Sequence, residues 1–87
     1  MSRIGGEVEQ LVELKATFDR EAQAVEELTR VIRAQLQNTA WEGPAADRFR
    51  STWTGEYEVS LRKLQVALQE AGAEVARRRE ALLQAGS

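Results

Sequence analysis

The sequence contains neither cysteine nor histidine among its 87 residues. Without cysteine, the chain forms no disulfide and offers no thiolate as a metal ligand or nucleophile. Without histidine, it lacks the commonest metal ligand and the usual general base near pH 7. These two absences exclude most catalytic templates. We therefore expect no enzyme activity, no catalytic residues, no cofactor and no bound metal.

Long apolar segments and targeting signals are also missing. No apolar run approaches the roughly 20 residues that a membrane-spanning helix needs, so we expect no transmembrane segment. The first residues, Met1 to Gly6, contain no apolar h-region. We therefore expect that the chain carries no cleavable signal peptide and does not use the general secretory route.

The chain has no large excess of charge of one sign, and its basic and acidic residues are not segregated. The 12 basic and 14 acidic residues are interleaved and give a formal net charge of -2. A nucleic-acid-binding surface needs a basic face that neutralises phosphates, so we expect no nucleic-acid partner. The short run Arg77, Arg78 and Arg79 is most simply explained by the favourable position of cations near a helix C-terminus. The alternative is contact with an acidic partner or anionic lipid.

What the sequence does contain is two stretches with helical periodicity, within a chain short enough for one domain, 1–87. Apolar residues recur at spacings of three, four and seven from about residue 7 to 38, and at three and four from about 44 to 83. The spacing predicts two amphipathic helices. We expect a core or dimer interface at Leu11, Leu14, Phe18, Val25, Leu28, Ile32, Phe49, Trp53, Tyr57, Leu61, Leu64, Leu68 and Val75.

The periodicity is interrupted only at the predicted turn, about residues 38–44. Gly43 permits a backbone that leaves helical geometry, and Pro44, the only proline, suits the first turn of a new helix. The pattern predicts an all-α, antiparallel helix-turn-helix hairpin. The second helix would extend ~60 Å at 1.5 Å per residue, so we expect its last turns to project beyond the first helix. Within it, Gly72 favours a close approach of the two helices.

A hairpin alone leaves part of each broad apolar stripe in water, and a domain this small buries a limited share of its surface. The economical solution is a second hairpin. We therefore expect the chain to pair into a four-helix bundle dimer with crossing angles near 20°.

Trp41 is unusual in a turn, because an indole buries a large apolar area and needs a partner for its N–H. The tripeptide Trp41-Glu42-Gly43 lies between two amphipathic helices and is followed by Ala45, Ala46, Phe49 and Trp53. In this setting the sequence resembles the WXG-motif family, small early-secreted-antigen-like proteins exported by type VII secretion systems of mycobacteria and other Gram-positive bacteria. The resemblance covers nearly the whole chain in architecture, and Trp41 and Gly43 in strict motif.

The resemblance implies synthesis in the cytoplasm and export of a folded homodimer, or of a heterodimer with a paralogous WXG-motif protein. It also implies a two-part signal. The Trp-x-Gly turn of one subunit lies beside the C-terminal helix end of the other, where a membrane-bound ATPase reads a Tyr-x-x-x-Asp/Glu motif. This sequence departs from the second part, since its only tyrosine, Tyr57, is followed four residues later by Leu61. We predict a type VII substrate that reaches the ATPase through its partner.

Other interpretations stay open. The hairpin could act inside the cell as an adaptor or chaperone for a larger secreted effector, or as a plain structural coiled coil. Trp41 could then be an anchor of the turn with no role in export. A neighbouring gene for a second Trp-x-Gly protein beside a secretion ATPase favours export, whereas a neighbouring large effector gene favours the adaptor.

Overall fold

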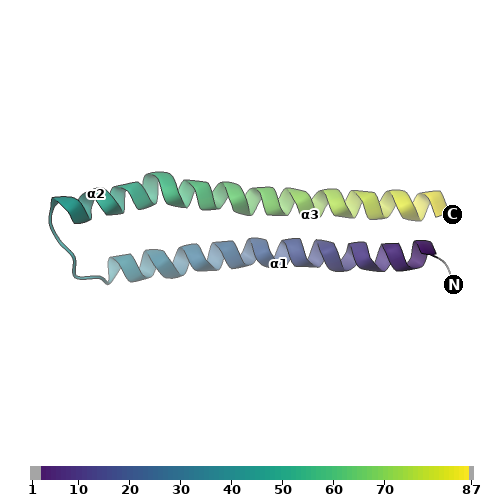
Figure 1. The fold of residues 1–87 in the computed structure, drawn as a ribbon, viewed down its shortest axis with the longest axis horizontal. Helices are drawn as coiled ribbons and strands as arrows, with labels where there is room; N and C mark the ends of the chain where they lie inside the picture. The colour runs from purple at the N-terminus through teal and green to yellow at the C-terminus, as the bar shows by residue number, and fades with distance from the viewer. Residues whose placement is uncertain (1–2, 87) are drawn as a thin grey trace.

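The computed structural model of the protein describes residues 3–86, which form a hairpin of two long helical arms (Figure 1). The first arm is helix α1 (Arg3–Gln37). The second arm consists of helix α2 (Pro44–Thr52), a π-helical turn η1 (Trp53–Tyr57) and helix α3 (Glu58–Gly86). No strand occurs in this part of the chain. The predicted all-α helical hairpin is confirmed, and its pairing into a four-helix bundle stays a prediction.

The two arms end differently from the expectation. Helix α1 begins at Arg3, ahead of the predicted start near residue 7, so its first turn lies level with the end of α3 (Figure 1). The prediction that the last turns of the second helix project is therefore wrong. The extra length of the second arm lies at the turn, where α2 extends past the end of α1 (Figure 1). The hairpin measures 65 × 17 × 11 Å.

Helices α1 and α3 pack along a seam whose residues are spaced by three and four positions, as in a coiled coil. At Gly72, which is buried, an added Cβ would lie 3.3 Å from Cβ of Phe18 and 3.0 Å from Oδ1 of Asp19. Such distances are shorter than ordinary van der Waals contacts, so a side chain at this position would require its neighbours on α1 to shift. The close approach predicted at Gly72 is confirmed.

The seam buries little apolar surface. Among the described residues only Ala22, Val25 and Ala46 are buried apolar side chains, and no large side chain is fully buried. Half-buried polar side chains occupy several seam positions between them. One of these is Thr29, whose hydroxyl donates to the carbonyl of Val25 at 2.8 Å. The hairpin alone therefore has a small hydrophobic core.

One extra residue interrupts the regular spacing of the second arm. In a π-helical turn each hydrogen bond spans five residues instead of four, so the turn contains one residue more than a turn of α-helix. Because η1 contains this extra residue, the seam passes from Trp53 to Glu58, where a regular α-helix would place Tyr57. The side chain of Glu58 is only 14% exposed, whereas Tyr57 is 50% exposed. The aromatic spacing Phe49, Trp53, Tyr57 is thus not continuous along the seam.

Candidate interaction site at the turn and on the apolar face

The turn begins where the last carbonyls of α1 find partners outside the helix. The N–H of Asn38 donates to the carbonyl of Ala34 at 3.1 Å, and the hydroxyl of Thr39 donates to the carbonyl of Gln35 at 2.6 Å. The turn ends at Gly43, whose φ of 113° lies in a region that L side chains rarely adopt. Pro44 follows as the first residue of α2. The predicted roles of Gly43 and Pro44 are confirmed.

Trp41 lies on this turn and is only partly covered. Its ring packs against that of Phe49, with centroids 5.7 Å apart and planes tilted by 47°. Both side chains stay about two fifths exposed, at 41% for Trp41 and 40% for Phe49. The backbone N–H of Trp41 donates to the carbonyl of Thr39 at 2.9 Å. The indole N–H has no hydrogen-bond partner among the described residues, so it is free to donate to another molecule.

Arg50, on α2, was not singled out from the sequence, yet it holds the turn together. Its guanidinium donates to the carbonyl oxygens of Trp41 at 2.7 Å, Thr39 at 2.9 Å and Leu36 at 3.2 Å. The only sequence signal for this role is indirect: the last turn of α1 contains no basic residue to stabilise its free carbonyls. Arg48 fits that signal equally well, so the sequence alone does not choose between the two arginines.

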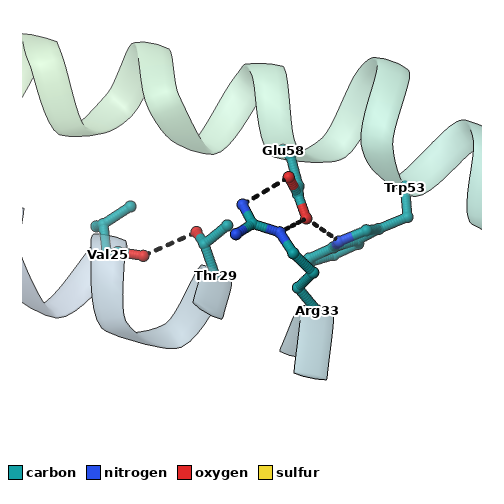
Figure 2. Close-up of polar contacts among 5 residues, drawn as sticks. All are labelled: Val25, Thr29, Arg33, Trp53 and Glu58. Carbon is teal, nitrogen blue, oxygen red and sulfur yellow. Dashed lines mark hydrogen bonds and ion pairs between the residues drawn. The ribbon is translucent and has the colours of Figure 1, made fainter. Parts of the chain in front are cut away.

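A second polar cluster ties the arms together next to η1 (Figure 2). Arg33 on α1 donates through Nε to Oε2 of Glu58 at 3.0 Å and through NH2 to Oε1 at 2.9 Å. The indole N–H of Trp53 donates to the same Oε2. The hydrogen bond from Arg33 is the main cause that lowers the pKa of Glu58, with a smaller contribution from Trp53. Glu58 is therefore ionised at neutral pH.

Shallow grooves flank this cluster. One, of about 400 Å³, runs between α1 and α3 and is lined by Glu26, Thr29, Arg30, Arg33, Glu58, Arg62 and Gln65. Charges of both signs meet here, because Arg33 pairs with Glu58 and Arg30 pairs with Glu27 at 2.7 Å. A second groove, of about 290 Å³, lies nearer the turn and is lined by Arg33, Leu36, Gln37, Arg50, Trp53, Thr54 and Glu58. We call the side of the hairpin with the larger groove the polar face.

The side opposite the polar face carries apolar side chains that the hairpin leaves uncovered. Residues of the polar face such as Glu26 and Arg62 directly follow a seam residue, whereas Leu28 and Leu64 directly precede one. In an antiparallel pair of helices these two kinds of position lie on opposite sides of the seam. Tyr57 and Leu14 also precede seam residues. With Ile32 at the seam edge they form what we call the apolar face.

The five members of the apolar face are similarly exposed. Leu14 is 42%, Leu28 41%, Ile32 38%, Tyr57 50% and Leu64 48% exposed. All five belong to the predicted core or interface positions. Of the others, Val25 is buried, Phe49 is exposed beside Trp41, and the half-buried ones lie along the arms at Leu11, Phe18, Trp53, Leu61, Leu68 and Val75.

No family model, curated protein or solved structure matches this chain. Within residues 3–86, no helix combines the length and the apolar character needed to cross a bilayer. The predicted basic run lies on α3, where Arg78 pairs with Glu74 at 3.5 Å and Arg79 approaches Glu80 at 4.0 Å. These acidic neighbours partly neutralise the run.

Proposed function

We propose that the chain pairs through its apolar face with a second helical hairpin and forms a four-helix bundle. The proposal is supported by the exposed leucines of the apolar face and by the small core of the single hairpin. Burying the remaining two fifths of a leucine side chain contributes roughly 1 kcal/mol. Three leucines and Ile32 on each hairpin, with Tyr57, supply a substantial driving force for association.

We further propose that the bundle is a substrate of a type VII secretion system. The observation that carries this proposal is Trp41, which is half exposed at the tip of the hairpin with a free indole N–H. An indole that stays 41% exposed beside the ring of Phe49 is available for recognition by another molecule. The resemblance of the turn to the WXG motif gives this recognition its direction, with Gly43 supplying the backbone conformation.

The partner supplies the part of the export signal that this chain lacks. Tyr57 is the last residue of η1, on the apolar face, and does not lie at the C-terminal end of α3, so it is not placed to act as the tyrosine of a C-terminal signal. The chain is then the signal-poor member of a heterodimer with a paralogous WXG-motif protein, because both chains of a homodimer would lack the same part of the signal. In a heterodimer, the secretion ATPase is reached through the partner.

Purification from the native host tests this proposal. The chain is captured from cell lysate and from culture filtrate, and the proteins that accompany it are identified by mass spectrometry. We expect a second small hairpin protein in both fractions. A monomeric chain that never leaves the cell would overturn the proposal.

The same apolar face also suits an intracellular adaptor, because a helical segment of a large effector buries it as well as a second hairpin does. The observation that favours this second candidate is the length of the face, which extends from Leu14 to Ile32 on α1. In that case a large protein accompanies the chain in the lysate, and the chain is missing from the filtrate.

A further inference from the structure

Arg50 reinforces three points of the chain that backbone hydrogen bonds also link, from Thr39 to Leu36 at 3.3 Å and from Trp41 to Thr39 at 2.9 Å. The carbonyl of Leu36 belongs to the last turn of α1, and those of Thr39 and Trp41 belong to the turn itself. Arginine suits this task because its planar guanidinium carries several N–H donors in fixed directions. One side chain of α2 thus supplies both the missing C-terminal cap of α1 and a brace for the turn.

The backbone of Trp41 is fixed by this arrangement, although its side chain is not. The N–H of Trp41 is bound to Thr39, and its carbonyl is bound to Arg50 at 2.7 Å. The indole has no hydrogen-bond partner among the described residues, and its ring packs against that of Phe49. Since Phe49 directly precedes Arg50 on α2, the ring contact and the guanidinium contacts hold the same residue from neighbouring positions. The backbone from which the indole extends is therefore held by Arg50.

We propose that Arg50 is a positioning residue for recognition through Trp41, by fixing the backbone of the turn that presents the partly exposed indole. This inference rests on the proposed function, in which Trp41 is the residue that is recognised. Arg50 acts in this role through its three hydrogen bonds to the carbonyls of Leu36, Thr39 and Trp41. Arg50 contributes by reducing the number of conformations that the turn adopts before a partner recognises Trp41.

Three substitutions separate this role from general stability. Arg50→Lys keeps the charge but replaces the planar guanidinium by a compact ammonium that does not span three carbonyls. Arg50→Gln removes the charge. Arg48→Gln is the matched control, because Arg48 lies on the same helix with no hydrogen bond or ion pair among the described residues. Each is made in the full chain and in a Trp53→Phe background, where Trp41 is the only tryptophan.

The readouts are helicity by circular dichroism, acrylamide quenching of Trp41 fluorescence, and appearance in the culture filtrate of a host with a working type VII system and the partner. We expect both Arg50 variants to stay helical, to show an increased quenching constant for Trp41 and to lose export, while Arg48→Gln matches the parent. If Arg50→Lys remains helical with unchanged quenching and unchanged export, the inference is wrong.

A Trp41→Ala variant distinguishes failure of the inference from failure of the proposed function. If Trp41→Ala loses export and the Arg50 variants do not, Arg50 has no positioning role and the proposed function stands. If Trp41→Ala is exported normally, recognition through Trp41 is refuted, and the role of Arg50 in it is refuted as well. Should Arg50→Gln unfold, the helical Arg50→Lys variant decides the question.

Discussion

Arg33 and Glu58, which are 25 positions apart in the chain, form a two-pronged ion pair at the end of the π-helical turn. Glu58 occupies the seam position that a regular helix would give to Tyr57. The extra residue of η1 therefore has two consequences: it brings a carboxylate to Arg33 and Trp53, and it moves the only tyrosine toward the apolar face. A distortion of the second arm thus shapes the surface proposed for pairing.

The lowered pKa of Glu58 predicts how this ion pair depends on pH. Because the pKa is lower in the folded state, the stabilisation is complete above the unfolded value of about 4.3 and is lost as the pH falls through the folded pKa. We expect Glu58→Gln to melt at a lower temperature than the parent at pH 7, and the difference to shrink below about pH 4.

Glu56→Gln is the control for that experiment, since Glu56 lies on η1 with no hydrogen bond or ion pair among the described residues. Thermal melts followed by circular dichroism between pH 7 and pH 3 make the comparison. A gap between parent and Glu58→Gln that stays constant across this range would show that the ion pair has no part in it.

Glycine is favoured at position 43 because of the backbone conformation, and not because a side chain would lack space. An added Cβ at Gly43 would meet no atom within 4 Å, but φ is 113°. A residue with a side chain in such a region costs of order 1–3 kcal/mol. We expect Gly43→Ala to lower the free energy of unfolding by that amount in urea titrations and to keep the helical content.

Gly55→Ala serves as its counterpart, because Gly55 also has open space around it and its φ is not positive. Gly55→Ala should not lower the free energy of unfolding as Gly43→Ala does. Equal losses of stability in the two variants would contradict the explanation by backbone strain.

The hairpin itself was accessible from the sequence, because Gly43 and Pro44 are strong local signals and the spacing of the leucines is regular. The start of α1 was misplaced since Gly5 and Gly6 each oppose a helix by ~1 kcal/mol, a local preference that a long helix overrides. The π-helical turn was not predicted, because Phe49, Trp53 and Tyr57 follow the spacing of a regular helix as well. Gly55 was the only hint.

The candidate site was predicted in part for a similar reason. Trp41 and Gly43 stand out as a motif, and the apolar face follows from periodicity. The roles of Arg50 and of the pair Arg33 and Glu58 depend on which residues the two arms bring side by side. That register is fixed by the close approach at Gly72 and by the extra residue of η1. The sequence alone does not show which residues of the two arms are then placed side by side.

The apolar face predicts a different outcome for two leucines of α3. Leu64 is 48% exposed in the hairpin, so Leu64→Asp should leave the helices intact. It should dissociate the dimer, because burying a carboxylate without a partner costs roughly several kcal/mol. Leu68 is half-buried in the seam, so Leu68→Asp should also weaken the hairpin itself. Light scattering measures the mass, and circular dichroism measures the helicity.

Val66→Asp is the matched control, since Val66 is 44% exposed and lies two positions from Leu64, on another side of the helix. It should remain paired. A parent chain that is a stable, well-folded monomer at micromolar concentration, with no partner in its host, would refute pairing through the apolar face.

We propose that the export signal is shared between two chains, with Trp41 supplied by this one. The most direct measurement is the amount of the chain in the culture filtrate of a host with a working type VII system. The chain is expressed alone, with a partner that carries Tyr-x-x-x-Asp/Glu at its C-terminal end, and as Trp41→Ala with that partner. We predict that the chain expressed alone is retained in the cytoplasm and that the chain expressed with the partner is exported. With the same partner, Trp41→Ala should show reduced export while its helicity and pairing are preserved. Efficient export of the chain alone would contradict the claim and would direct attention to Arg77, Arg78 and Arg79 as a separate signal.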